Sequence, residues 1–257
     1  MNIYFFLTFI LGLCFGSFLN AYLYRTRKSM SMVKPRSQCT KCGYTLGFFD
    51  LIPLLSFFFL KGKCRKCHSK IAIRYVVLEL VTGILFALTF LLSDVDIFDK
   101  VSLFLFLKNL VVVFYLEFIF CYDLWYGEIP FQVTFVPGSI LGFFLIVLNV
   151  SSFSSEVFGI LCGAGFFLFQ YIVSKGKWIG SGDIGMGFFM GAVLGYPFIV
   201  VALFLSYVGG SLVVLHLLFL KKIDKKGIIP FGTFLSVATG LTLFFGENIV
   251  GLLKQLS

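Results

Sequence analysis

Two aspartates, Asp123 and Asp183, have the residue type and setting for joint acid–base chemistry. Asp123 lies in FCYDLWYGEIP directly after an apolar run, and Asp183 lies in KWIGSGDIGMG directly before one. Two carboxylates brought together cannot both ionise cheaply, so one keeps a proton and the other loses it. The ionised group can draw a proton from water while the other donates to a carbonyl, which suffices for peptide hydrolysis without a covalent intermediate. The alternative is that Asp183 caps a helix and Asp123 is simply solvated.

Glycines surround Asp183 at positions 180, 182, 185 and 187. A glycine has no Cβ, so its backbone can approach another helix or an extended ligand closely. We therefore predict that Gly180 and Gly182 contact the substrate of the aspartate pair.

Four cysteines form two C-x2-C pairs separated by 21 residues, namely Cys39 with Cys42 and Cys64 with Cys67. In a reducing cytoplasm such pairs favour a structural four-thiolate zinc site over disulfides. Incidental buried thiols are one alternative. Haem attachment at CRKCH, which ends at His68, is another, but that reaction belongs outside the cytoplasm. The intervening FFDLIPLLSFFFL is apolar but interrupted by Asp50 and Pro53, and we expect it at the membrane surface.

Three glutamates are further candidates for contacts with a basic ligand. Glu79 and Glu117 fall inside apolar runs, where an ionisable group is costly and by default functional. Glu128 follows Asp123 closely. Glu79 and Glu117 could instead be structural partners of Arg74, Lys108 or backbone groups.

The composition indicates an all-α polytopic membrane protein. The chain has 257 residues, of which 59% are hydrophobic and 13% charged, and its mean hydropathy is +1.01, whereas soluble domains are about 25% charged. Crossing a bilayer takes about 20 apolar residues. We predict eight spans, at about 3–24, 75–93, 101–122, 131–149, 156–174, 184–196, 198–220 and 231–253, with the first retained rather than cleaved. The count depends on the short, glycine-rich sixth span.

The distribution of charge orients these spans. Residues 25–74 hold twelve of the 21 basic residues and one acid, and Lys and Arg prefer the cytoplasmic side. We therefore expect the N-terminus outside, and cytoplasmic loops at 25–74, 123–130, 175–183 and 221–230. Eight spans place Lys221, Lys222, Lys225 and Lys226 inside, and both aspartates at the cytoplasmic face. The net charge of +9 then reflects topology rather than nucleic-acid binding.

Several motifs, in order along nearly the whole chain, resemble those of the type IV prepilin peptidases. GSGD at 180–183 matches the G-x-G-D motif of intramembrane aspartyl proteases. FGSFLNAYLYR, the cysteine loop with its D-x-I-P-x-L-S core, RYVVLELVTG, DLWYGEIP and IPFGTFLSVATG are similar to successive segments of the prepilin leader peptidase/N-methyltransferases. Asn20 and Glu79 match motif positions whose roles we do not assign.

This resemblance implies a multi-pass protease of the bacterial inner membrane that removes the basic leader of type IV prepilins or pseudopilins at the cytoplasmic face. The family's catalytic aspartates correspond to Asp123 and Asp183. Many members also methylate the new N-terminus from S-adenosylmethionine, although nothing in the chain resembles a soluble fold for that cofactor. Three positions depart from the family pattern: Phe131 replaces Asp or Asn, Gly185 replaces Lys, and Thr233 replaces a common Pro.

The organisation expected is a first transmembrane helix at 1–24, a cytoplasmic zinc loop domain at 25–74 and a transmembrane protease domain at 75–257. A transporter would show symmetry between its halves, yet the cysteine loop has no counterpart. A non-catalytic scaffold with a zinc-bound docking loop would tolerate loss of both aspartates. A G-x-G-D protease acting on general signal peptides would lack the cysteine loop.

Overall fold

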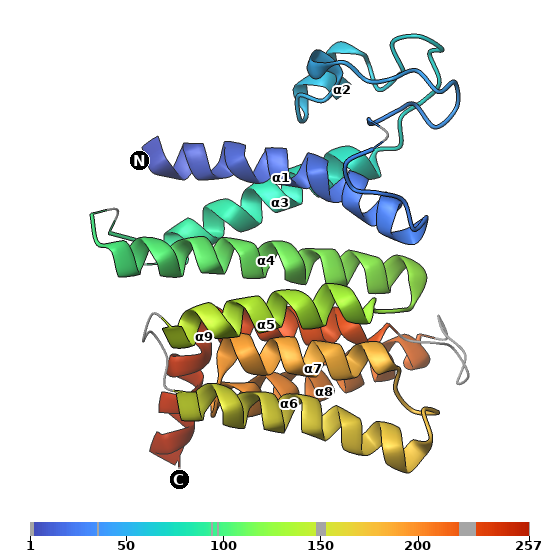
Figure 1. Ribbon diagram of the computed structural model, residues 1–257. Helices are drawn as coiled ribbons and strands as arrows, with labels where there is room; N and C mark the ends of the chain where they lie inside the picture. Colours follow the sequence, from blue (N-terminus) through green and yellow to red (C-terminus); the bar gives the residue numbers. More distant parts are fainter. Residues whose placement is uncertain are drawn as a thin grey trace. The chain divides into compact units, whose positions relative to one another are not determined.

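The computed structural model describes residues 3–34, 36–93, 95–96, 98–147, 153–220 and 230–256 (Figure 1). Within these residues the regular secondary structure is helical, apart from isolated bridges in the cysteine loop. The elements in chain order are α1 Ile3–Arg27, η1 Phe48–Asp50, α2 Leu55–Phe59, α3 Arg74–Leu92, α4 Lys100–Tyr126, α5 Phe131–Val147, α6 Phe153–Ser174, α7 Ser181–Leu194, α8 Phe198–Phe219 and α9 Phe231–Leu256. Asp94 and the predicted loop lysines Lys221, Lys222, Lys225 and Lys226 lie outside the described residues.

Six of these helices, α1, α3, α4, α6, α8 and α9, are long and apolar enough to cross a membrane. They coincide with six of the predicted spans. The remaining two predictions, 131–149 and 184–196, correspond to α5 and α7, whose described apolar portions are shorter. Helix α7 has 14 residues, so it is about 21 Å long at 1.5 Å per residue.

Two helix boundaries differ from the sequence prediction. The third predicted span ends at 122, but α4 continues to Tyr126, so Asp123 lies inside the helix. The helix stops where Gly127 adopts a left-handed backbone with φ of 67°, a conformation that glycine accepts without strain. The sixth predicted span begins at 184, but α7 begins at Ser181 and includes Asp183 in its first turn.

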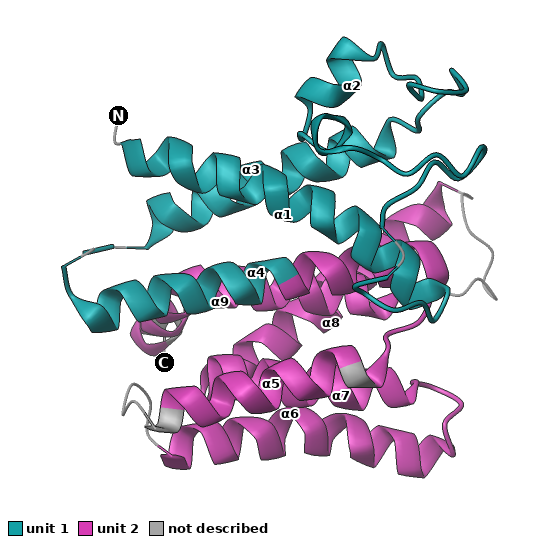
Figure 2. Ribbon diagram, turned by 45° about the horizontal axis from the view of Figure 1, so that its top comes forward, with its two compact units in different colours: residues 1–114 teal, residues 115–257 magenta. Residues whose placement is uncertain are grey.

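The chain divides into two compact units, residues 1–114 and 115–257, and the division falls inside α4 (Figure 2). In the first unit α1 packs on α3. A Cβ added at Gly12 would lie 2.8 Å from the Cα of Gly83, so these backbones are in direct contact. The side chain of Asn20 donates to the carbonyl oxygen of Tyr75 at 3.1 Å. This bond gives Asn20 a structural role that its sequence context did not reveal.

In the second unit, α7 packs against α5, α6, α8 and α9. Its closest partner backbone is that of α6, where a Cβ at Gly163 would collide with the carbonyl oxygen of Gly187 and one at Gly159 with that of Gly191. Small residues of this kind allow helices in a membrane to approach closely. The glycine-rich sequence of α7 thus suits a central helix, and it holds Asp183 in a closely packed bundle.

Candidate active site

Asp123 is buried on α4 and faces the beginning of α9. Its Oδ2 atom accepts a hydrogen bond from the backbone N–H of Thr233 at 3.0 Å, and the N–H of Gly232 also interacts with the carboxylate. The first N–H groups of a helix have no partner within the helix, so they are suited to a carboxylate. Sequence reasoning named Thr233 only as a departure from the family pattern, and missed that its backbone holds Asp123.

Asp183 occupies the third position of α7. Its Oδ2 atom accepts a hydrogen bond from the N–H of Gly180 at 2.9 Å, which closes the helix start in the manner of a capping box. Asp183 therefore does cap the helix. This cap uses only one of the roughly four acceptor positions of an ionised carboxylate, so Asp183 can accept further hydrogen bonds.

One cavity of about 800 Å³ is lined by both aspartates. Asp123 and Asp183, sixty residues apart in the chain, are also close enough to interact electrostatically. Glu128, Gly180 and Gly182 line the same cavity. Five of the residues singled out from the sequence thus meet in one place.

The Ile129–Pro130 turn is fitted against the glycines of this cavity. A Cβ at Gly182 would collide with the carbonyl oxygen of Ile129, and one at Gly232 would collide with the Ile129 side chain and lie 2.9 Å from Oδ2 of Asp123. Gly182 therefore provides room for the chain's own backbone at Ile129, beside the cavity that it lines. This packing is an additional reason for glycine at that position.

Gly185 and Phe131, two departures from the family pattern, are in contact with each other. A Cβ at Gly185 would lie 3.0 Å from the Phe131 ring and would collide with Oγ1 of Thr134. The Phe131 ring is stacked on Phe135 at a centroid distance of 5.2 Å. At the two positions where the family pattern has Lys and Asp or Asn, this chain has a glycine and an aromatic ring that are close to each other.

The other two glutamates are not among the residues that line the cavity. Glu117 is buried on α4, six residues before Asp123. Glu79 belongs to the first unit, where its Oε2 atom accepts a hydrogen bond from the N–H of Leu54 at 2.9 Å. Leu54 has φ of 58°, so Glu79 secures a strained point of the cysteine loop against α3.

The four cysteines come together in the first unit. The sulfur atoms of Cys39, Cys42, Cys64 and Cys67 all lie within 4.8 Å of one another. The Cys39 and Cys67 sulfurs are 3.8 Å apart, close to the roughly 3.8 Å expected between thiolates bound to one tetrahedral zinc at 2.3 Å. The donor set and its spacing therefore fit a zinc ion.

Each C-x2-C pair forms the same turn. The N–H of Gly43 donates to the carbonyl oxygen of Cys39, and that of His68 donates to Cys64, both at 3.0 Å. Gly43 and His68 both have positive φ, of 69° and 54°. His68 is thus the counterpart of a turn glycine. Backbone N–H groups of Cys42 and Lys41 lower the pKa of Cys39 to about 6, whereas, despite the N–H of Tyr44, burial and the neighbouring thiols raise the pKa of Cys42 to about 11; a metal would bind both as thiolates.

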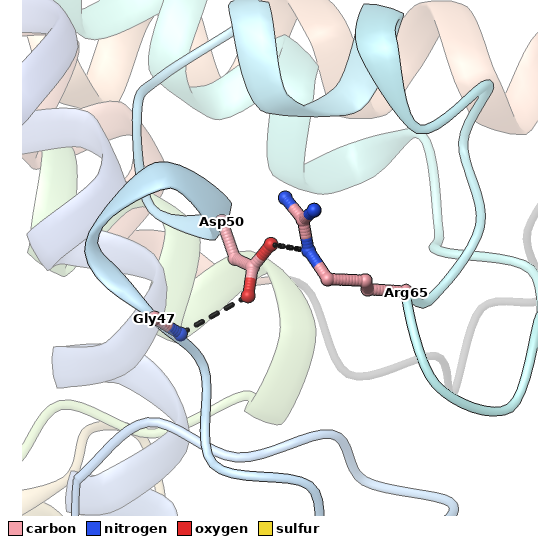
Figure 3. Close-up of polar contacts among 3 residues, drawn as sticks. All are labelled: Gly47, Asp50 and Arg65. Carbon is pink, nitrogen blue, oxygen red and sulfur yellow. Dashed lines mark hydrogen bonds and ion pairs between the residues drawn. The ribbon is translucent and has the colours of Figure 1, made fainter.

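An ion pair connects the apolar segment between the two cysteine pairs, residues 48–60 (the insert), to the second cysteine turn (Figure 3). Asp50 accepts from Nε of Arg65 at 2.7 Å and from the N–H of Gly47 at 3.0 Å. Burial alone would raise the pKa of Asp50, but the bonds from Arg65 and Gly47 lower it below its ordinary value. The insert is thereby fixed to the residues between Cys64 and Cys67.

Comparison with known proteins shows which family the chain belongs to. The chain is 32% identical to the prepilin leader peptidase/N-methyltransferase of Bacillus subtilis (strain 168) over 250 residues, covering 94% of each chain. The chain belongs to the prepilin leader peptidase/N-methyltransferase family. It is also 33% identical to the protein of that name from Myxococcus xanthus (strain DK1622), over 82% of this chain and 62% of that one.

The A24 peptidase family is supported by a second match. Residues 10–93 match the model of the bacterial peptidase A24 N-terminal domain, a stretch that contains the cysteine loop. The prepilin leader peptidase/N-methyltransferase of Pseudomonas aeruginosa (strain PAO1) is 27% identical over 94% of this chain and 90% of its own. No solved structure matches the chain. Membership of this family makes the chain a multi-pass protein of the bacterial inner membrane.

Proposed function

We propose that this chain is an aspartyl endopeptidase that cuts the basic leader from type IV prepilins or pseudopilins at the cytoplasmic face of the membrane. The observation that carries the proposal is the meeting of Asp123 and Asp183 in one cavity. Membership of a prepilin peptidase family supports the choice of substrate.

In this mechanism one carboxylate is ionised and the other protonated. The ionised group takes a proton from water, and the resulting hydroxide equivalent attacks the scissile carbonyl carbon while the protonated group donates to its oxygen. The tetrahedral intermediate then breaks its C–N bond as the carboxyl that took the proton from water gives it to the leaving amine, and the other carboxylate recovers its proton from the gem-diol hydroxyl. The N–H groups of Thr233 and Gly180, which hold the two carboxylates, keep their orientation through the cycle.

Glu128 is proposed to attract the basic leader. It lines the aspartate cavity, whereas the cysteine loop is itself strongly basic and would repel a cationic segment. Glu79 and Glu117 were also predicted as leader contacts. Both are less suited to that role than Glu128, because Glu79 accepts the Leu54 N–H and Glu117 is buried.

The proposed topology has eight spans with the N-terminus outside, of which α5 and α7 are the short ones. Its parts are the first transmembrane helix at 1–24, the cytoplasmic loop domain at 25–74 and the protease domain at 75–257. Cys39, Cys42, Cys64 and Cys67 would hold a structural zinc that cross-links the two cysteine turns.

We also propose N-methylation of the new N-terminus from S-adenosylmethionine. Its support is the name that the relatives share. The mass of the cleaved product tests it directly: an added methyl group is expected only when S-adenosylmethionine is supplied.

Loss of either aspartate should abolish cleavage. We expect Asp123→Asn and Asp183→Asn each to reduce the cleavage rate at least about 100-fold, because each removes one partner of the acid–base pair. The measurement is conversion of a prepilin by the purified protein in detergent. Glu247→Gln is the matched control, since it removes a carboxylate from α9 far along the chain from Asp123. Cleavage by either asparagine variant at the wild-type rate would reject the catalytic pair and favour a scaffold.

A further inference from the structure

A second polar pair faces the aspartate cavity from two other helices. Gln170 on α6 and Tyr207 on α8 are hydrogen-bonded side chain to side chain, with Gln170 Nε2 at 3.0 Å and Oε1 at 3.2 Å from the phenolic oxygen. Both residues line the cavity that contains Asp123 and Asp183. No motif in the sequence drew attention to either of them.

The Tyr207 ring is held by aromatic neighbours. It meets Phe231 edge-on at a centroid distance of 4.9 Å and Phe166 at 5.6 Å. Phe231 is the first residue of α9, the helix whose N–H groups hold Asp123. The phenolic oxygen therefore has a fixed position relative to the reacting groups, as binding groups require.

The pair has more hydrogen-bonding capacity than its mutual bond consumes. A phenol offers one donor and two acceptor positions, and an amide side chain offers two donors and an acceptor. Whichever side chain donates in the mutual bond, hydrogens and lone pairs remain to serve a ligand. A bond that served only to join α6 and α8 would not need to line a cavity.

A peptide that leaves this cavity as an apolar helix needs hydrogen-bond acceptors of the kind that Gln170 and Tyr207 offer. The first four N–H groups of any helix lack acceptors within the helix, and inside a cavity lined by protein the side chains of its walls can supply them. Gln170 lies four residues before the end of α6, and Asp183 is the third residue of α7. The consecutive helices α6 and α7 thus bring the pair to nearly the same level as the carboxylate.

We propose that Gln170 and Tyr207 bind the substrate backbone at the first turn of its apolar helix, directly after the scissile bond. The inference rests on the proposed peptidase function and deepens it. The two are positioning residues: they hold the peptide so that its scissile carbonyl lies between the aspartates, and they exchange no proton with it.

Kinetics of two variants test the assignment. Tyr207→Phe removes only the hydroxyl and keeps the aromatic contacts, and Gln170→Met removes the amide at similar length. We expect each to lower kcat/KM for a synthetic peptide with a basic leader and an apolar helix by roughly 5- to 10-fold, mainly through KM. Tyr171→Phe, at the neighbouring position of α6, is the matched control and should leave both constants unchanged.

A modified substrate separates binding from a structural role. Replacing, one at a time, the backbone amides of the second, third and fourth residues after the scissile bond by esters removes single N–H donors and leaves the scissile amide unchanged. For at least one of these esters the loss caused by Tyr207→Phe or Gln170→Met should shrink toward none, because the bond is already missing. A structural defect would instead lower kcat/KM by the same factor for every ester.

The outcomes are separable. Wild-type cleavage with unaltered kinetics in both variants, or equal losses for all esters, overturns the inference and leaves the peptidase intact. Failure of the wild-type protein to cleave the peptide, or a prepilin, overturns the proposed function and this inference together.

Discussion

At the scale of single residues, the aspartates were predictable and their supports were not. Asp123 and Asp183 could be found because an apolar chain has few acids, and because each adjoins an apolar run. The backbone N–H groups that hold them come from Thr233 and Gly180. Backbone donors leave no mark of residue type, so only the fold could show the Thr233 contact, which joins segments 110 residues apart.

Thr233 supplies a donor that proline could not. We expect Thr233→Pro, which restores the residue common in the family pattern, to lower kcat/KM for prepilin cleavage by only about 2- to 3-fold, because it removes the N–H of Thr233 but leaves that of Gly232 at Asp123. Proline is tolerated in the first turn of a helix, so α9 should still form. The measurement is steady-state cleavage together with thermal unfolding of the purified protein.

Thr233→Val is the control for this change. It keeps the N–H and loses only the hydroxyl, which donates to the carbonyl oxygen of Pro230 at 2.7 Å. Near-normal cleavage is expected. If the valine and proline variants lost activity equally, the hydroxyl rather than the N–H would matter, and the role given to the backbone would be wrong.

At the scale of helices, the glycines of the short α7 lack Cβ atoms, so neighbouring backbone can pack directly against the helix and position it. The sequence predicted a short, glycine-rich segment at 184–196, but it could not say which neighbours require the glycines. Contacts with α6 and with the Ile129–Pro130 turn answer that question. Phe131 and Gly185 are separate departures from the family pattern in the sequence. In the structure they lie against each other, so they can be understood as one linked change.

The contact between α5 and α7 predicts a coupled pair of substitutions. Gly185→Lys alone should impair folding or cleavage, because its side chain would press on Phe131 and Thr134. Adding Phe131→Asp should recover a substantial part, since it removes the ring and supplies an opposite charge in a site of low dielectric constant. Thermal unfolding and cleavage of the two single variants and the double variant measure the coupling.

A control for charge accompanies this experiment. Phe131→Leu combined with Gly185→Lys removes the aromatic ring, and so makes space for the lysine, without providing a carboxylate. Recovery equal to that of the aspartate variant would show that space alone is limiting. Additive losses in the double variant would contradict any coupling between the two positions.

At the scale of the whole chain, hydropathy predicted the all-helical class and most helix positions. Six long apolar helices fall where the spans were placed, because burial in lipid forces backbone groups into helices. The cysteine loop was also evident from spacing alone. The division of the chain inside α4, between residues 114 and 115, could not be predicted, since it depends on contacts between residues distant in sequence.

Metal binding in the first unit is predicted to be independent of the aspartates. Purified protein should contain about one zinc per chain, and Cys39→Ser should lose most of it. The cysteine loop, which has many lysines and arginines, should then be cut faster by trypsin. Metal analysis and limited proteolysis of the full chain provide the measurements.

Cys162→Ser is the matched control, because Cys162 lies on α6 outside the cluster. It should retain the metal and the proteolysis pattern of the wild type. Zinc content unaffected by Cys39→Ser would contradict the four-thiolate site.

The length of α7 bears on how water reaches the reacting groups. A helix of 14 residues covers about 21 Å, whereas the hydrocarbon core is about 30 Å thick. Because α7 is mostly buried against α5, α6, α8 and α9, protein rather than lipid surrounds the missing length. A helix this short leaves room for water to reach its first turn, where Asp183 lines the cavity. Hydration of the reaction is thus set by the bundle and not by the acyl chains.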